Sequence, residues 1–387
     1  RYLDDPNIDY VAGIPLHDFR MLTNGYNPYV IAYESVAAAG KLYVNENDLF
    51  SWLHPGPWHV HYDEEDPFGG AVAMHRRNLA ADAVRGAMSQ RFSLMSTWHR
   101  DDALQEEFQR HTAISRVALN VDRTPAVEVA FIVDDTSFAW APPTSTWLHG
   151  TNKLMLHAVG KAGAPVGVWL MSDLDRLPDG IRLVIVASAI AAKDEDLAKL
   201  SAMLRGGARS VVAVGPIGLV SPRTGEWRPE KPGQLLGLPI EVVDERLPVG
   251  VLDATTPVSS YPETARPRAQ ASSPGRFRYP DGMAASAERQ LAAGGRLVWL
   301  GAPPLAPELW RQWIEAAGAH CYAPTGFFVH AARDIVSVTA PAAGRAVVRF
   351  PDEVEARDLF DGFEGRGYGI ECPFEAGQTR LLRLRRK

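Results

Sequence analysis

Two carboxylates end a short apolar run in the stretch Lys41-Leu-Tyr-Val-Asn-Glu-Asn-Asp48. Side chains alternate along a strand, so Val44, Glu46 and Asp48 are expected to share one face. The residues that follow are rich in aromatic rings and imidazoles: Trp52, His54, Trp58, His59, His61 and Tyr62. A carboxylate at the carboxyl end of a strand, next to an aromatic loop, is how a (β/α) barrel builds a sugar site. The alternative is a strand end whose glutamate is only solvated.

Other side chains near these strand ends are candidate substrate ligands. Sugars stack their apolar faces on aromatic rings, which makes Trp52, Trp58 and Trp98 candidate platforms, although simple packing explains each of them equally well. Arg20 could reach a sugar hydroxyl or a carboxylate of the site. Asp48 is expected either to hydrogen-bond within the site or to cap the chain that follows.

His59-x-His61, followed by acidic residues from Asp63 to Asp66, has the residue types of a metal site. Carboxylates in a loop with proline and glycine are usually only solvated, and the sequence specifies no third ligand. We therefore predict no metal. No strand signal is followed by Gly-x-Gly-x-x-Gly, so no dinucleotide or other cofactor is predicted.

The composition describes an ordinary globular chain. It has 387 residues, enough for two or three domains, with 46% hydrophobic and 22% charged residues. A net charge of -6 gives no basic field for nucleic acid or an anionic membrane surface, and no apolar run reaches transmembrane length. Cys321 and Cys372 cannot form a disulfide framework. We expect a cytoplasmic protein.

The chain opens with Arg1-Tyr-Leu-Asp-Asp-Pro6, which has neither an initiating methionine nor a signal-peptide pattern. This beginning is typical of the middle of a longer sequence. We therefore expect a truncated or processed polypeptide.

Residues 1–105 alternate strand and helix signals. Strands are expected over 8–12, 42–45 and 91–97, and helices over 29–39 and 71–87. Asn27-Pro28 before the first helix and Gly40 after it are typical helix boundaries. This is a run of three βα units, whereas a full barrel has eight such units and roughly 250 residues. The pattern predicts the last units of a (β/α)8 barrel, with a helix over 101–117 leading out of it.

Residues 106–325 begin a second alternation of strands and helices. Strands are expected over 127–133, 166–170, 183–189, 210–214 and 296–300, and helices over 152–163, 194–204, 284–293 and 307–317. The strands are nearly continuous in apolar residues, which suits a parallel sheet covered on both faces. We predict an open, doubly wound α/β domain.

Residues 326–387 change pattern again. Short strand signals at 327–331, 335–339, 346–350, 356–360 and 379–384 are separated by glycine, proline and aspartate. Strands of this length and spacing predict a small antiparallel β-sandwich.

The order of these parts resembles the β-galactosidases of glycoside hydrolase family 42. Residues 8–15 with Arg20 resemble the sixth barrel strand of that family, and Glu34-Ser35, residues 40–43 and Glu46-x-Asp48 resemble the seventh. Residues 127–135 resemble the first strand of its middle domain, which is related to glutamine amidotransferases. Residues 358–362 and 375–380 resemble its C-terminal sandwich. Phe50-Ser51 stands where many relatives have Arg-Thr, which leaves the details of the sugar subsite open.

The resemblance implies a retaining glycosidase, in which a nucleophile and an acid/base lie about 5–5.5 Å apart. Glu46 matches the nucleophile. The acid/base would end the fourth strand, which is absent from this chain, and Asp4, Asp5 and Asp9 precede or begin a strand. The chain alone is therefore expected to be inactive. Alternatives are a non-catalytic oligomerising or carbohydrate-binding protein, and one part of a split enzyme.

The expected partners follow from the same resemblance. They are a carbohydrate substrate and either further copies of the chain, with a trimer favoured, or a chain that carries the upstream half of the barrel. Neither nucleic acid nor a membrane is expected. Three βα units alone would expose an open sheet edge, so we predict poor solubility or self-association of the isolated chain.

The middle domain lacks the nucleophile of an active amidotransferase. Such an enzyme needs a cysteine on the sharp turn after a strand, and the turn after residues 210–214 reads Gly215-Pro-Ile-Gly218. Cys321 lies at the far end of the domain without an obvious partner histidine. The domain is therefore expected to be structural, and the resemblance implies a role in oligomerisation.

Overall fold

The computed structural model describes residues 2–23, 25–26, 29, 31–53, 65–93, 98–141, 145–187, 189–243, 251–253, 256–259, 268–272 and 275–386. The chain folds into two compact units. The first contains Arg1–Val127, Gly160–Pro165 and His320–Lys387, and the second contains Glu128–Val159 and Val166–Ala319. Among the described residues, no helix has both the length and the apolar composition needed to cross a membrane.

The first unit begins with a parallel sheet in the order β1 (Tyr10–Gly13), β2 (Leu42–Asn47) and β3 (Met88–Arg91). Helices α1 (Tyr33–Ala38) and α2 (Pro67–Arg85) connect the strands, and α3 (Asp102–Ala118) follows them. Asp66 and Asp101 begin the two longer helices by accepting backbone N–H groups of the first turn at 2.9 Å. The third strand ends at Arg91 instead of beginning there, and residues 94–97 lie outside the described residues.

The C-terminal part of this unit is a five-stranded antiparallel sheet. Its spatial order is β15 (Phe328–Ala332), β16 (Ile335–Thr339), β19 (Thr379–Arg386), β17 (Gly344–Asp358) and β18 (Glu364–Phe374). β17 is one long strand with a register shift between Arg349 and Val354, where the sequence predicted two strands. β18 was not predicted because its alternating glycines resemble a turn. One of them, Gly365, has no room for a side chain, since a Cβ would lie 2.4 Å from Cγ2 of Ile370.

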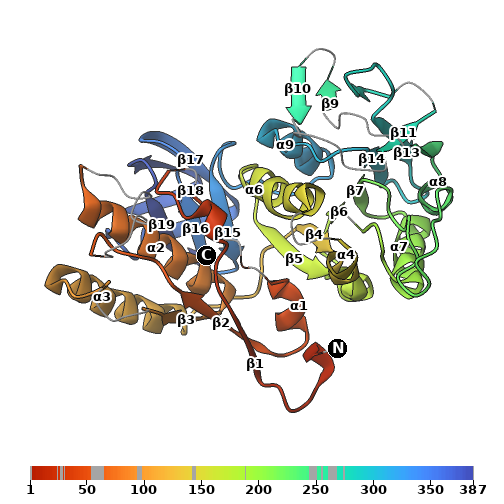
Figure 1. Ribbon diagram of the computed structural model, residues 1–387. Coiled ribbons are helices and arrows are strands. Elements are labelled where there is room, and N and C mark those ends of the chain that lie inside the picture. Colours follow the sequence, from red (N-terminus) through yellow and green to blue (C-terminus); the bar gives the residue numbers. More distant parts are fainter. Residues whose placement is uncertain are drawn as a thin grey trace. The chain divides into compact units, whose positions relative to one another are not determined.

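Helix α2 packs against this C-terminal sheet (Figure 1). The shared apolar core contains Leu79, Ala80, Ala83 and Val84 of α2, Ile114 and Ala118 of α3, and Ala332, Ile335 and Leu381 of the sheet. The βα units and the C-terminal sheet, more than two hundred residues apart in sequence, therefore stabilise each other.

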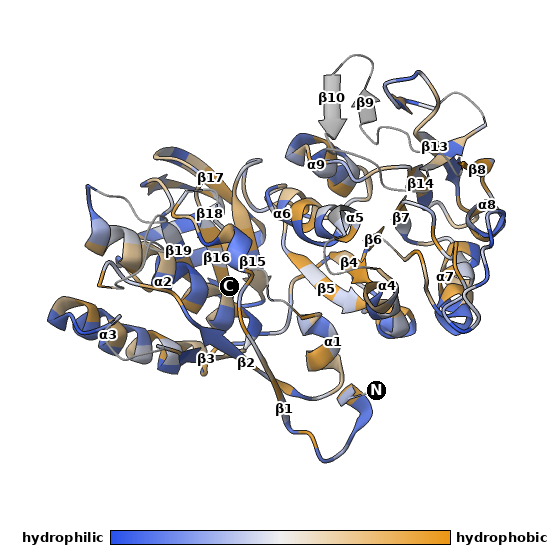
Figure 2. Cartoon of the chain, in the orientation of Figure 1, coloured by the Kyte–Doolittle hydropathy of each residue, from blue (hydrophilic) through white to orange (hydrophobic). Residues whose placement is uncertain are grey.

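The second unit contains a six-stranded sheet. Its order is β13 (Ser286–Gln290), β14 (Arg296–Leu300), β7 (Ser210–Val214), β6 (Leu183–Ala187), β4 (Val129–Val133) and β5 (Val166–Leu170), and only β13 is antiparallel. Its main helices are α4 (Asp135–Trp140), α6 (Met155–Gly160), α7 (Asp194–Gly206) and α9 (Pro307–Ala316). The central strands are buried, and Figure 2 shows β4 in the colour of hydrophobic residues. Both features agree with the predicted α/β sheet.

One predicted helix of this unit is wrong. Residues 284–293 contain the edge strand β13, which forms a hairpin with β14. Alanine-rich composition favoured a helix, but Leu291 N–H donates to Gly295 O and closes a tight turn that holds the two strands in register. Tertiary pairing therefore overrides local propensity here.

Short elements complete the second unit. They are α5 (Thr146–Leu148), α8 (Lys231–Leu236), the pair β8 (Ile240–Val243) and β11 (Arg268–Ala271), and the set β9 (Val251–Asp253), β10 (Thr256–Ser259) and β12 (Phe277–Arg278). The sequence predicted only irregular chain for most of this region.

A buried ion pair joins β17 to β19. Nη1 of Arg380 donates to Oδ2 of Asp358 at 2.6 Å, and Oδ1 of Asp358 accepts the N–H groups of Phe360 and Leu381, both at 3.1 Å. Asp358 is 1% exposed. The two segments that resemble the C-terminal sandwich of the family thus meet through this pair.

Asp358→Ala is expected to lower the free energy of unfolding by about 3–5 kcal/mol, because it leaves the Arg380 charge buried without its partner. The measurement is urea denaturation followed by circular dichroism. Glu371→Ala, which removes an exposed ion pair with Arg345 on the same sheet, is the matched control and should change the midpoint little. Equal midpoints for Asp358→Ala and Glu371→Ala would contradict the stabilising role of the Asp358–Arg380 pair.

Candidate active site

Glu46 lies one residue before the end of β2 and is half-buried. Its neighbours Asn45 and Asn47 are buried and both donate to Asp82 of α2, at 2.8 and 3.1 Å. Neighbouring side chains point to opposite faces of a strand. Glu46 therefore faces away from α2, on the same side as Val44 and Asp48.

Asp82 is the centre of a buried hydrogen-bond network. Its Oδ1 also accepts the hydroxyl of Tyr29 at 2.7 Å, and Asn47 donates in addition to Ser89 Oγ of β3 at 2.6 Å. Burial raises the pKa of Asp82 to about 6, although these hydrogen bonds favour the charged form. The network fixes the rotation of β2 and hence the direction of Glu46.

Arg85, at the end of α2, lies beside this network. Its guanidinium is 5.0 Å from the ring centroid of Tyr29 and 5.5 Å from that of Tyr33, and 3.9 Å from the carboxylate of Glu34. A cation is favoured at a helix C-terminus and over aromatic faces. Glu34, one of the residues that carry the family resemblance, therefore has a packing role here.

Arg20 and Asp48 form a buried clamp after β2. Nη1 of Arg20 donates to the backbone oxygen of Asp48 at 3.0 Å, Nη2 pairs with the Asp48 carboxylate, and His17 Nε2 lies 3.3 Å from the other carboxylate oxygen. Arg20 is 5% exposed. Of the two contacts considered for Arg20, the structure shows the one to a carboxylate.

The tryptophans of the site differ in exposure. Trp98 is buried, and its ring packs edge-on against Phe50 at 4.5 Å while its backbone oxygen accepts the Ser51 hydroxyl. Trp52 is half-buried and edge-on to Phe68 at 5.7 Å. Trp58 lies outside the described residues. The Phe50-Ser51 pair, where this chain departs from the family pattern, therefore holds Trp98 in place.

Comparison with solved structures identifies the fold. The β-galactosidase from Rahnella sp. R3 matches 98% of this chain with a TM-score of 0.67 and 16% identity. Gan42B, a GH42 β-galactosidase from G. stearothermophilus, matches 92% with a TM-score of 0.60 and 15% identity. The chain has a GH42-like fold. It spans 60% and 56% of the lengths of these two enzymes.

A similar fold is found in an enzyme that is named for a different sugar. The α-L-fucosidase isoenzyme 2 from Paenibacillus thiaminolyticus matches 92% of the chain with a TM-score of 0.54 and 12% identity. No protein-family model matches the sequence, and no curated protein is significantly similar. At these identities the likeness shows the fold alone.

Behind the strand ends of the GH42-like fold, three histidines surround Phe108 of α3. The rings of His75, His99 and His111 lie 5.0, 5.3 and 5.9 Å from the Phe108 ring. His99 Nε2 is 3.1 Å from the backbone oxygen of Leu49, which ties the segment before α3 to the chain just after Asp48. The sequence analysis missed this cluster, because its members are spread over residues 75–111.

Charged groups face the histidine cluster from β3, α2 and α3. Nη2 of Arg91 lies 3.1 Å from His111 Nδ1, and Glu107 lies 3.2 Å from His111 Nε2. Arg76 of α2 donates to Glu107 at 2.6 Å. Burial lowers the pKa of all three histidines, that of His75 most strongly, and Nε2 of His75 has no hydrogen-bond partner within the described part of the chain.

In the parts of the chain that the structure describes, no three His, Cys, Asp or Glu side chains are arranged to hold a metal ion. His59 and His61, the candidate ligands from the sequence, lie outside those parts.

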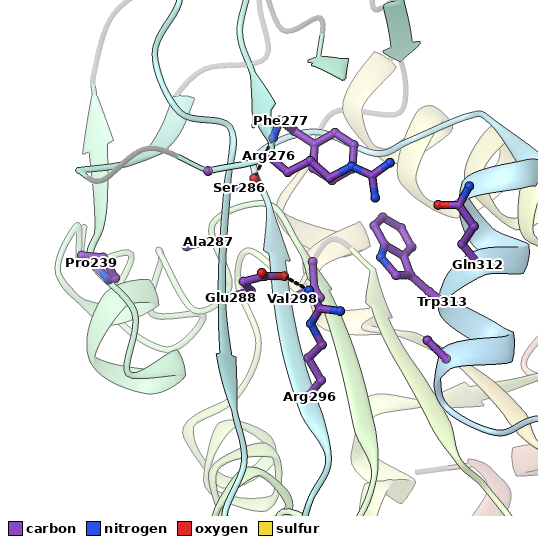
Figure 3. Close-up of a pocket in the computed structure, with 12 residues that line it drawn as sticks. Pro239, Arg276, Phe277, Ser286, Ala287, Glu288, Arg296, Val298, Gln312 and Trp313 are labelled. Atoms are coloured by element: carbon purple, nitrogen blue, oxygen red, sulfur yellow. Dashed lines mark hydrogen bonds and ion pairs between the residues drawn. The ribbon is translucent and has the colours of Figure 1, made fainter. Parts of the chain in front are cut away.

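A cavity of about 380 Å³ lies in the second unit, as Figure 3 shows. Arg276, Phe277, Gln312 and Trp313 line it on one side, and Glu288 and Arg296, which form an ion pair, line it on the other. The Trp313 ring is edge-on to Phe277 at 6.1 Å. An aromatic ring beside planar amide, guanidinium and carboxylate groups can accommodate a small polar molecule.

The turn after β7 has no space for a catalytic side chain. Gly215 has φ of +78°, and a Cβ there would lie 2.4 Å from Cζ2 of Trp147. The backbone oxygen of Gly215 also accepts the indole N–H of Trp299 at 2.9 Å. Trp147 and Trp299, both buried, therefore pack around this turn.

The Asp82 network gives a stability prediction. Asp82→Asn replaces one acceptor oxygen with an N–H donor that must face the donors Tyr29, Asn45 or Asn47. We expect a loss of about 1–3 kcal/mol in the free energy of unfolding at neutral pH, because a buried donor is left without an acceptor. Urea denaturation measures it. Asp102→Asn, at an exposed position of α3, is the control. An Asp82→Asn variant as stable as the parent would contradict a stabilising role of the hydrogen bonds to Asp82.

The histidine cluster gives a prediction on pH. Folded His75 resists protonation, whereas in the unfolded chain it titrates near 6.5, so protons bind preferentially to the unfolded state and stability falls as the pH drops below about 6.5. His75→Phe keeps a ring in the cluster and removes the proton site. We expect its thermal midpoint to fall less than that of the parent between about pH 7.5 and about pH 5.5.

The parent and His75→Phe both retain Asp82, whose raised pKa makes stability change with pH in the opposite sense. The comparison therefore isolates the contribution of His75. His149→Phe, at an exposed position of the second unit, is the control and should follow the parent. Parallel pH profiles for the parent and His75→Phe would disprove the contribution of His75.

Proposed function

We propose that the chain is part of a retaining glycoside hydrolase of the β-galactosidase type, with Glu46 as its nucleophile. One observation carries the proposal. Glu46 is a half-buried carboxylate near the carboxyl end of a parallel strand in a GH42-like fold, turned away from the covering helix. Catalytic residues of (β/α) barrels come from such strand ends. The structural similarity to two β-galactosidases supports a galactoside as substrate.

In the proposed reaction, a Glu46 oxygen attacks the anomeric carbon while the acid/base protonates the departing glycosidic oxygen. The resulting galactosyl ester is then hydrolysed by water, from which the same acid/base, now ionised, takes a proton. Asp48 does not suit the acid role, because Arg20 binds both its carboxylate and its backbone oxygen. We therefore assign Arg20 and Asp48 to positioning.

The acid/base is proposed to come from a segment that this chain does not contain. The support is the face of the parallel sheet that carries Glu46. Tyr10 and Leu42 pair in register, as do Val44 and Met88, so these side chains share that face. Tyr10 is 59%, Leu42 45% and Met88 53% exposed. Parallel sheets are normally covered on both faces, so a further segment is expected to cover this one.

The remaining site residues have proposed supporting roles. Trp52, half-buried beside the loop after β2, is proposed as a platform for the sugar. Trp58 is proposed as a second platform on the basis of the sequence alone. Trp98 is proposed to shape the site from behind, since its ring is packed against Phe50.

The proposed domain organisation follows the family. Residues 1–105 would be the last βα units of a barrel, 106–325 a non-catalytic amidotransferase-like domain, and 326–387 a C-terminal β-sandwich. The three parallel strands, the blocked turn at Gly215 and the antiparallel C-terminal sheet support these three assignments in turn. A trimer formed through the middle domain remains part of the proposal.

A second candidate function is non-catalytic carbohydrate binding. The cavity beside Trp313 and Gln312 favours it, because it offers an aromatic ring and several planar polar groups at the size of a small sugar. The two functions differ in whether Glu46 is essential.

The test uses the polypeptide as its source produces it, after its intact mass has been compared with 42.3 kDa. Glu46→Gln is expected to lower kcat for an aryl β-galactoside by about 10⁴-fold or more, because the nucleophile is lost. Azide should restore turnover to Glu46→Ala and give the α-galactosyl azide, since it replaces the missing carboxylate. Glu65→Gln, at an exposed position before α2, is the control.

Unchanged kcat in Glu46→Gln would overturn the nucleophile assignment. Absence of turnover by the polypeptide as its source produces it would favour the binding function. The 387-residue chain alone is expected to show no turnover. Turnover by this chain that disappears in Glu46→Gln would overturn the need for a further segment.

A further inference from the structure

A groove of about 480 Å³ runs over the C-terminal sheet. Six charged residues line it, two from each of three adjacent strands: Glu355 and Arg357 of β17, Glu364 and Arg366 of β18, and Arg383 and Arg385 of β19. Their neighbours along the strands, such as Ala356 and Leu384, belong to the buried core. The charged side chains therefore share the opposite face of the sheet.

Strand register arranges these residues in two rows. In one row Arg357 lies between Glu364 and Arg383, and in the other Glu355 lies between Arg366 and Arg385. Directly paired side chains on neighbouring strands are close enough to interact. Each row thus has two cations and one anion.

The carboxylates of the groove pair with the arginines of β17 and β18. Glu364 lies 3.7 Å from Arg357, and Arg366 lies 3.2 Å from Glu353 and 4.0 Å from Glu355. Over residues 275–386, which the structure describes without a gap, Arg383 and Arg385 have no ion pair with a carboxylate. The groove therefore has an excess of two positive charges within a chain whose net charge is -6.

Arg357 and Arg383 are directly opposed across the strands. Like charges in this position destabilise a sheet. Glu364 compensates the charge of Arg357, but no carboxylate within residues 275–386 pairs with Arg383. A local arrangement that costs stability in this way is characteristic of a functional site. Guanidinium groups also match phosphate, sulfate and carboxylate groups through paired hydrogen bonds.

We propose that this groove binds a small ligand that carries two adjacent anionic groups. The two groups would neutralise Arg383 and Arg385 and relieve the repulsion between Arg383 and Arg357. The volume is that of a small-molecule site, which favours a compact dianion over a polymer. The site is separate from Glu46 and does not depend on the proposed hydrolase activity.

The experiment is calorimetric titration of the chain with pyrophosphate and with citrate, which represent a phosphate and a carboxylate source of the same chemistry. We expect a Kd of about 1 mM or tighter for at least one probe, and the tighter one identifies the source. The double variant Arg383→Gln/Arg385→Gln should bind at least about tenfold more weakly. Arg345→Gln, on the same sheet outside the groove, is the matched control and should bind like the parent.

Stability separates a binding role from a structural one. Without ligand, Arg383→Gln should be as stable as the parent or more so, because it removes the repulsion with Arg357. The preferred probe should raise the thermal midpoint of the parent but not that of the double variant. Absence of binding up to about 10 mM, equal binding by the double variant, or a clear loss of stability in Arg383→Gln would overturn the proposal.

Discussion

The carboxylate of Asp82 holds the last turns of α2 to the end of β2, and the geometry around Glu46 depends on it. A strand end is free to rotate unless its side chains are fixed on at least one face. Here two asparagines, one on each side of Glu46, donate to the same buried carboxylate. A buried carboxylate costs free energy unless its hydrogen bonds are complete, so the network is stable only in one arrangement. That arrangement is the one in which Glu46 faces away from the helix.

The same helix connects the strand end to the C-terminal sheet. One face of α2 carries the polar residues Asn78 and Asp82, and another carries Leu79, Ala83 and Val84 in the core shared with β15, β16 and β19. Because both sets of residues lie on α2, a change in the C-terminal sheet is expected to shift Asp82 as well. The C-terminal sheet therefore helps to position α2, the helix that carries Asp82.

The sequence predicted those features that depend on local pattern. Strands such as Leu183–Ala187 and Ser210–Val214 are continuous apolar runs, and they were found where expected because nothing competes with burial there. β13 and β18 were missed because alanine and glycine carry no strand signal. They are strands because they pair with β14 and β17. At the site, alternation was enough to predict the face of Glu46. The histidines around Phe108 could not be found, since only the packing of α2 against α3 brings them together.

The exposed face of the three-stranded sheet constrains folding and function at once. One face of this sheet is sealed by α2, through Asn45, Asn47 and Ser89. The other presents the apolar side chains of Tyr10, Leu42 and Met88 around the single acidic residue Glu46 of β2. Exposed apolar surface on a parallel sheet favours burial against another segment, and such burial would also exclude water from the neighbourhood of Glu46. As the proposed nucleophile, Glu46 would be shielded from water only when this face is covered, so completing the hydrophobic core and completing the proposed site would be the same step.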